Sequence, residues 1–96
     1  MPKEKIIEAL RKELPHLRDS YNVKSLGLFG SFVRDEQKKG SDVDVLVEFN
    51  KPTDLFKFMD LEGYLNTVLG KRVDLVMKSA LKPRIGKHIL EEVKYI

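Results

Sequence analysis

Three aspartates are the residues of this 96-residue chain whose type and spacing best suggest chemistry. Asp42 and Asp44 flank Val43 in a segment where apolar and polar residues alternate, and Asp74 lies in a second segment of the same kind. Side chains two apart on a strand share a face of the sheet. Clustered carboxylate oxygens favour Mg²⁺ or Mn²⁺ over zinc, so the three are candidate metal ligands and catalytic residues.

Mutual repulsion makes such a carboxylate cluster costly without a ligand. Two unit charges about 4 Å apart repel by roughly 4 kcal/mol at an effective dielectric of 20. A divalent cation or a raised carboxyl pKa would relieve this repulsion. An isolated Asp-x-Asp pair is more often two solvent-facing strand residues. Asp is a poor strand former, however, and three on one face give folding no evident benefit.

Gly30 and Ser31 predict a phosphate-binding turn. A glycine after a strand lets the backbone turn tightly and approach a ligand, and the amides that open the next short helix can bind phosphate. The Ser31 hydroxyl would add a donor. Ten residues separate this turn from Asp42. A strand starting there would hold the aspartates beside the turn, with bound phosphates and metal within reach of each other.

Alternating apolar residues predict the strands that position these groups. The middle strand, over residues 43–49, is the clearest, with its valines on one face and Asp44 on the other. Asp74 likewise has the opposite parity to the apolar residues around it, so all three aspartates are expected on the face away from the core. The two other strands are expected over residues 24–29 and 72–77.

Apolar residues at helical spacing predict three long helices, besides a short one after Gly30. Pro15 is expected to end or bend the first helix at Leu14. Thr53 is expected to cap the second helix, and Gly70 to end it. The three helices are expected to begin at Pro2, after Thr53 and at Pro83, the last of them running through Ile96.

This order of elements predicts an α+β fold in a single domain over residues 1–96. We expect a two-layer structure, with helices on one face of a small mixed sheet and the active site on the open face. The absence of cysteine excludes disulfides and thiolate metal sites. No apolar run reaches the roughly 20 residues needed to span a membrane, and no signal-peptide core is present, so we expect a cytoplasmic protein.

Residues 30–34 (GSFVR) and 41–47 (SDVDVLV) together resemble the signature of the DNA polymerase β-like nucleotidyltransferase superfamily. The resemblance extends to its small stand-alone branch, the minimal nucleotidyltransferases, often encoded beside a HEPN-domain partner. Residues 73–76 (VDLV) resemble the strand that supplies the third carboxylate. The family commonly has glycine where Asp35 stands, and Asp tolerates the left-handed backbone better than most residues.

The resemblance implies transfer of a nucleoside monophosphate, AMP from ATP, to a hydroxyl, with two Mg²⁺ ions as cofactors. It further implies an antitoxin that adds AMP to a tyrosine of a HEPN toxin. Ser41 is included among the site residues, although its type also suits a turn before the strand. The implied metal ligands are Asp42, Asp44 and Asp74, and the implied nucleotide-binding residues are Gly30, Ser31, Arg34 and Ser41.

Two other functions remain open from the sequence. One is a non-catalytic module that neutralises its partner by contact alone. The other is a transferase whose acceptor is an RNA end. The net charge of +3 permits nucleic-acid contact without arguing for it, so RNA is not favoured.

Overall fold

The computed structural model describes all 96 residues and contains one four-stranded mixed sheet. Its strand order is β3-β2-β1-β4, in which β1 is antiparallel to both β2 and β4, while β2 and β3 are parallel. The predicted α+β fold is confirmed, and the structure places the two aspartate-bearing strands side by side. The strands are β1 (Val23–Phe29), β2 (Val43–Phe49), β3 (Val73–Met77) and β4 (Lys94–Tyr95).

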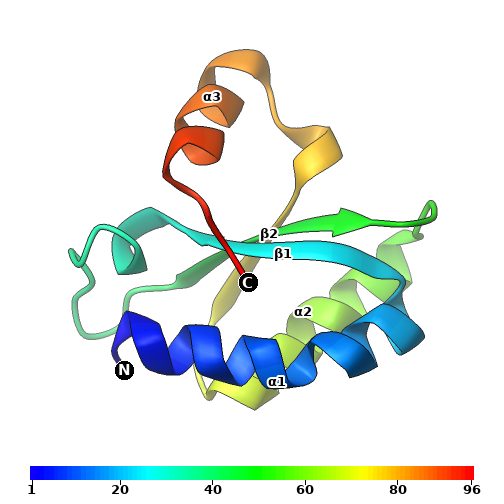
Figure 1. The fold of residues 1–96 in the computed structure, drawn as a ribbon, viewed down its shortest axis with the longest axis horizontal. Helices are drawn as coiled ribbons and strands as arrows, with labels where there is room; N and C mark the ends of the chain where they lie inside the picture. Colours follow the sequence, from blue (N-terminus) through cyan, green and yellow to red (C-terminus); the bar gives the residue numbers. More distant parts are fainter.

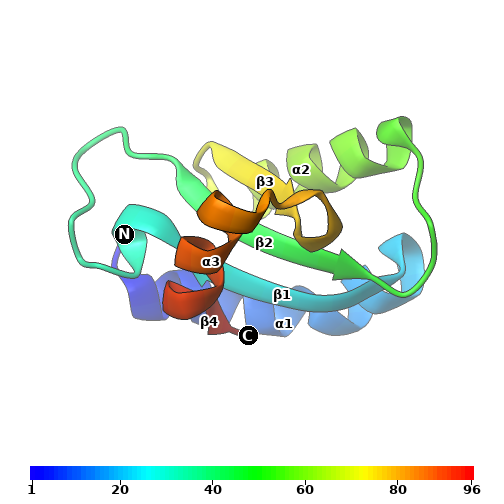
Figure 2. The ribbon, with the colours of Figure 1, turned by 90° about the horizontal axis from the view of Figure 1, so that it is seen from above.

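Helices cover both faces of this sheet, but unequally. The helices α1 (Lys3–Tyr21) and α2 (Leu55–Leu69) lie side by side under one face, whereas α3 (Pro83–Glu92) stands over the other (Figure 1). Seen from above, α3 crosses over β2 and β1 (Figure 2). The expectation that all helices share one face is therefore wrong for α3. The chain leaves β3 and must cross the sheet to reach the far side of β1, where β4 pairs.

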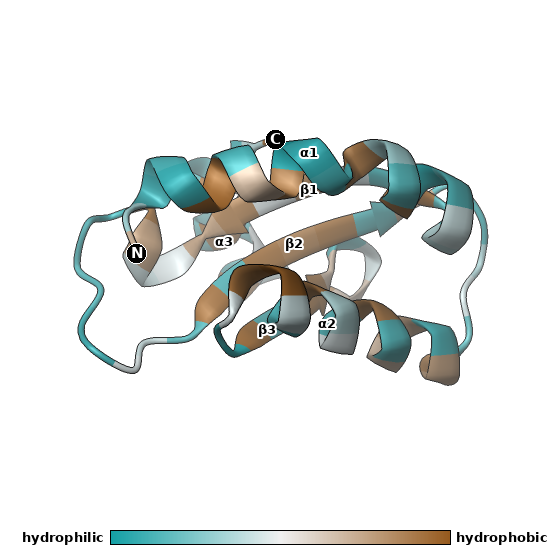
Figure 3. Ribbon diagram, turned by 90° about the horizontal axis from the view of Figure 1, so that it is seen from below, coloured by the Kyte–Doolittle hydropathy of each residue, from teal (hydrophilic) through white to brown (hydrophobic).

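The hydrophobic core lies between the sheet and the α1–α2 layer. In Figure 3, where the α1–α2 layer faces the viewer, β2 is coloured mostly as hydrophobic. Alternate residues of the strands point into this layer, as the period of two requires. Burying each such side chain contributes about 1.5–3 kcal/mol. The fully buried members include Val43, Val45 and Val47 of β2, Ile6, Leu10 and Leu17 of α1, and Leu61 and Leu65 of α2.

The first helix does not end at Leu14. It continues through Pro15 to Tyr21, because the apolar spacing also continues and buries Leu17 completely. Packing therefore outweighs the backbone hydrogen bond that a proline inside a helix cannot make. Asn22 ends the helix in a left-handed conformation (φ 57°), and its N–H donates to the Leu17 carbonyl.

The start of α2 also differs from the prediction. Asp54, not Thr53, caps this helix, since its carboxylate accepts a hydrogen bond from the Lys57 N–H at 2.8 Å. Gly70 ends α2 as predicted, with φ at 62°.

The last helix stops at Glu92, and residues 94–95 form the short strand β4 instead. Gly27 permits this arrangement, because the Val93 side chain occupies the space that a Cβ at Gly27 would need. None of the helices combines the length and apolar character needed to cross a membrane.

Candidate active site

Asp44 and Asp74 are direct neighbours in the pairing of the parallel strands β2 and β3. Neighbouring strands lie about 4.8 Å apart, so the two carboxylates share a small area of the sheet face opposite the α1–α2 layer. The register is fixed because Val43, Val73 and Leu75 are buried on the other face. A slip of one residue would turn the aspartates into the core.

Side chains of α2 hold β3 in this position. β3 is an edge strand, and two of its outward N–H groups donate to α2 rather than to another strand. The Val73 N–H donates to Asn66 Oδ1 at 2.6 Å, and the Leu75 N–H donates to Glu62 Oε2 at 3.1 Å. These bonds fix the strand on both sides of Asp74.

Asp44 has the strongest electrostatic perturbation among these carboxylates. Partial burial raises its pKa from 3.8 to about 6, and the negative charges of Asp74 and Asp42 add to the effect. Arg34 opposes the shift and Glu92 adds to it. The repulsion expected between these carboxylates therefore acts on Asp44.

The Gly30 backbone lies directly against Asp44. Gly30 has a left-handed φ of +79°, and a Cβ there would collide with the Asp44 carboxylate. Because Phe29 pairs with Asp44 across β1 and β2, the turn after β1 must pass beside this carboxylate. Gly30 opens the 3-10 helix η1 (Gly30–Phe32), which also holds Ser31. The predicted close approach of turn and aspartate is confirmed.

Arg34 and the Gly30 amide both bind Glu92, a residue that the sequence did not single out. Arg34 Nη1 lies 2.7 and 2.8 Å from the two Glu92 carboxylate oxygens, and Arg34 Nε lies 2.6 Å from Glu36 Oε1. The Gly30 N–H donates to Glu92 Oε2 at 3.0 Å. One signal was available: an acidic residue at a helix C-terminus is unfavourable to the helix dipole and requires compensation elsewhere.

Residues 3–96 match the nucleotidyltransferase domain family. The chain belongs to this family. It is 52% identical over 93 residues to the protein adenylyltransferase MntA of Thermococcus cleftensis, covering 97% of this chain and 91% of that protein.

Solved structures have the same fold. One, provisionally named a minimal nucleotidyltransferase, is 32% identical with a TM-score of 0.81, covering 98% of this chain and 95% of that one. A toxin–antitoxin chain crystallised with AMP-PNP is 25% identical with a TM-score of 0.72, covering 99% and 72%. The fold recurs in a chain from the Shewanella oneidensis complex of a tri-AMPylated HEPN toxin with an MNT antitoxin (24% identity, TM-score 0.62, covering 97% and 66%).

The remaining predicted site residues of this nucleotidyltransferase lie around the aspartates. The Ser41 hydroxyl accepts a hydrogen bond from the Lys38 N–H at 2.8 Å and so closes the turn before β2. Its contact with nucleotide stays a prediction. A shallow pocket beside Ser41 and Asp42 is also lined by Lys71 and Arg72, two cations that sequence analysis did not assign to the site. Asp35 adopts a left-handed φ of 57°, as expected for a residue at a family glycine position.

The donor set of this nucleotidyltransferase suits a hard divalent cation. No three His, Cys, Asp or Glu side chains are grouped closely enough, as they stand, to hold a metal ion. Asp42 and Asp74 are nevertheless exposed and make no ion pair, so their carboxylates are not committed to other partners. The all-oxygen donor set and the repulsion felt at Asp44 fit the Mg²⁺ that the family implies.

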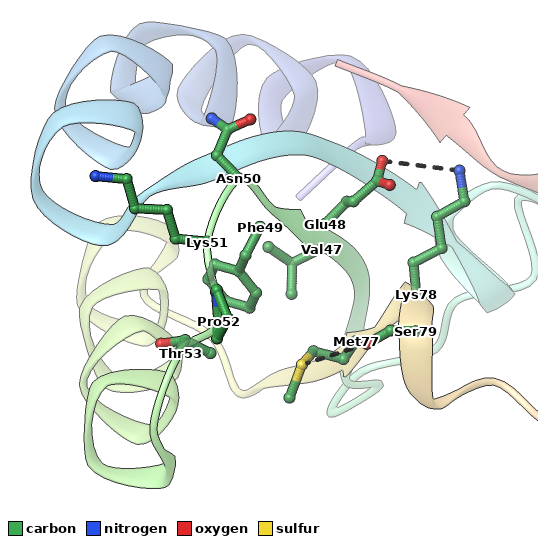
Figure 4. Close-up of a pocket in the computed structure, with 10 residues that line it drawn as sticks. All are labelled: Val47, Glu48, Phe49, Asn50, Lys51, Pro52, Thr53, Met77, Lys78 and Ser79. Atoms are coloured by element: carbon green, nitrogen blue, oxygen red, sulfur yellow. Dashed lines mark hydrogen bonds and ion pairs between the residues drawn. The ribbon is translucent and has the colours of Figure 1, made fainter.

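A second pocket, of about 390 Å³, lies at the opposite ends of β2 and β3 (Figure 4). Its lining includes Glu48 and Lys78, whose charged atoms are 3.8 Å apart. Glu48 is four residues from Asp44 along β2, which corresponds to about 13 Å. The pocket is therefore separate from the carboxylate cluster.

Proposed function

We propose that this nucleotidyltransferase transfers AMP from ATP to a hydroxyl group of a partner protein. The observation that carries the proposal is the contact of the Gly30 backbone with Asp44, which itself pairs with Asp74. This arrangement supports the proposal because the turn predicted to bind phosphate lies beside paired carboxylates. The relative that is 52% identical is named a protein adenylyltransferase, and a structural relative was crystallised with an ATP analogue, which supports AMP as the group transferred.

The roles of the residues follow from their chemistry. Backbone amides of the Gly30–Ser31 turn, the Ser31 hydroxyl and Arg34 would bind the triphosphate. Asp42, Asp44 and Asp74 would hold one or two Mg²⁺ ions. Bound Mg²⁺ would neutralise phosphate charge and lower the pKa of the acceptor hydroxyl.

Asp74 comes from a separate strand and would accept the acceptor's proton. In the transfer, the acceptor oxygen bonds to the α-phosphorus as the bond from this phosphorus to the bridging oxygen breaks. Pyrophosphate leaves, and the hydroxyl proton passes to Asp74.

We further propose that the acceptor is a tyrosine of a HEPN-domain toxin and that the protein acts as its antitoxin. The support is the family, the protein acceptor implied by the name of the Thermococcus cleftensis relative, and the recurrence of the fold in a complex with an AMPylated HEPN toxin. Inhibition of the partner without its modification would indicate a non-catalytic module that acts by contact. Transfer of AMP to RNA would indicate a transferase whose acceptor is an RNA end.

Intact mass spectrometry of a co-expressed HEPN partner tests the proposal. The expected result is a gain of one or more AMP units on the partner, located on tyrosine, that requires Mg²⁺. Asp42→Asn combined with Asp44→Asn should abolish the gain. Asp60→Asn is the matched control, because Asp60 is an exposed aspartate on α2 outside the site. An unmodified partner that is still inhibited, or label found on RNA instead, would refute protein AMPylation.

A further inference from the structure

Glu92, the last residue of α3, fills an anion position beside the Gly30–Ser31 turn. One of its carboxylate oxygens accepts the Gly30 N–H at 3.0 Å, and both lie within 2.8 Å of Arg34 Nη1. These are two of the donors that the proposed function assigns to a nucleotide phosphate. Carboxylate and phosphate oxygens accept hydrogen bonds from the same kinds of donor, so Glu92 stands where a phosphate oxygen would be bound.

The charge of Glu92 opposes nucleotide binding in two ways. It occupies Arg34, the cation that acts on the Asp44 carboxyl, and it adds a negative charge that acts on Asp44. The Glu92 side chain is also shielded, at 24% exposure, which weakens screening by solvent. An incoming triphosphate would therefore have to displace Glu92 to use the Gly30 amide and Arg34.

The rest of α3 is loosely attached to the body of the protein. Gly86 is its only buried residue, and no α3 side chain belongs to the hydrophobic core. Ile85 and Leu90 are 61% and 45% exposed. The helix lies on the face of the sheet opposite the α1–α2 layer (Figure 1). This end of α3 is held by the Glu92 contacts and by β4, which follows at Lys94 and pairs with β1. Displacing Glu92 alone therefore leaves both the core and the β4 pairing intact.

We infer that Glu92 is an internal competitor for the nucleotide: docking of α3 and binding of the triphosphate exclude each other at Gly30 and Arg34. Nucleotide binding therefore releases the Glu92 end of α3. This inference rests on the proposed function for the identity of the phosphate-binding donors. It concerns binding and helix docking, and it is independent of which acceptor receives AMP.

Glu92→Gln tests the competition directly. The amide oxygen can still accept a hydrogen bond, but without the negative charge its contacts with Gly30 and Arg34 are weaker, so docking is weakened rather than abolished. We expect Mg²⁺–AMP-PNP to bind roughly threefold to tenfold more tightly in calorimetry, the range for losing one partly shielded charged contact. Glu91→Gln makes the same charge change at the exposed neighbouring position and should leave affinity unchanged. Equal or weaker binding by Glu92→Gln would overturn the inference.

Hydrogen exchange of residues 83–96 gives a readout that does not depend on affinity. Exchange should be faster in free Glu92→Gln than in free wild type, and AMP-PNP should accelerate it in wild type. Unchanged exchange in the free variant would refute docking of α3 through the Glu92 charge. Tighter binding and faster exchange without AMP transfer to any partner would refute the proposed function alone, whereas transfer with unaltered binding and exchange would refute the competition alone.

Discussion

The position of Asp44 beside other carboxylates lowers the free energy of unfolding of the protein. Its pKa of about 6 instead of 3.8 arises from burial and from the charges of Asp74 and Asp42. The native state thus binds this proton more tightly than the unfolded chain does. The contribution of Asp44 to the free energy of unfolding therefore falls as pH rises from about 4 to about 6, and it stays low at higher pH.

We expect Asp44→Asn to stabilise the metal-free protein at pH 7.5 while abolishing AMP transfer. The full pKa shift would correspond to about 3 kcal/mol, and solvent screening of a partly exposed group reduces this to about 1–2 kcal/mol. Urea denaturation in EDTA at pH 7.5 and pH 4 measures the difference, which should shrink at the lower pH. Asp60→Asn should show no such pH-dependent gain. A variant that is less stable than wild type at pH 7.5 would contradict the assigned charge repulsion.

Gly30 offers a second test at the scale of one residue. Gly30→Ala should lose nucleotide affinity and destabilise the protein by about 2–4 kcal/mol, because the new methyl group meets the Asp44 carboxylate and the backbone is left-handed. Gly40→Ala is the matched control. Gly40 also has a left-handed φ, of +88°, but nothing lies within 4 Å of the position that an alanine methyl group would take there, so only about 1 kcal/mol of backbone strain is expected. Equal losses in the two variants would show that backbone strain, not the Asp44 contact, matters at Gly30.

At the scale of elements, the strands were predictable because the alternation of apolar and polar residues within each strand shows which of its faces is buried. Val43, Val45 and Val47 alternate with polar residues, and that alternation alone places Asp44 on the face away from the core. The pairing of β2 with β3 then brings Asp74 alongside. The metal and nucleotide roles of these residues remain predictions.

The features that sequence analysis missed depend on contacts between distant segments. A local rule for Pro15 predicted that the first helix ends or bends at Leu14, but the helix continues to Tyr21 because Leu17 is buried in the core. The two residues of β4 are too few to show a period, and their pairing depends on the space at Gly27. The role of Glu92 becomes visible only when the chain returns across the sheet to Gly30.

Pro15 allows a test at the scale of a single element, the helix α1. It lies exposed inside α1, where it cannot donate the helical hydrogen bond, so Pro15→Ala should raise the free energy of unfolding by about 1–3 kcal/mol. Pro2→Ala is the control: Pro2 precedes the helix, and the carbonyl that accepts the first N–H groups is retained. Thermal and urea unfolding measure both. A loss of stability in Pro15→Ala would mean that the proline fits a distortion that α1 requires.

At the scale of the whole molecule, charge and core lie on opposite sides of the sheet. Asp44 pairs with Asp74 and feels the charge of Asp42 away from the core, while the core fills the layer between the sheet and the α1–α2 helices. Ligands on the α3 side therefore act on stability chiefly through charge.

Mg²⁺ should accordingly raise the melting temperature. At ten times its dissociation constant a ligand adds about 1.4 kcal/mol, which corresponds to roughly 5–10 °C in a domain of this size. EDTA should reverse the gain, and KCl at equal ionic strength should not reproduce it. Asp42→Asn combined with Asp44→Asn should remove the response. An equal rise in this double variant would place the cation elsewhere.

Small groups of hydrogen bonds protect both sides of the sheet. Two outward N–H groups of the edge strand β3 donate to Asn66 and Glu62. On the other side, β1 is covered by the two residues of β4, after which the Ile96 N–H donates to the Leu26 carbonyl at 2.9 Å. An open strand edge is a template on which another chain can add. These few bonds therefore keep the protein from associating as well as holding its strands in place. A chain that lost them would first show concentration-dependent association, before any change in its core.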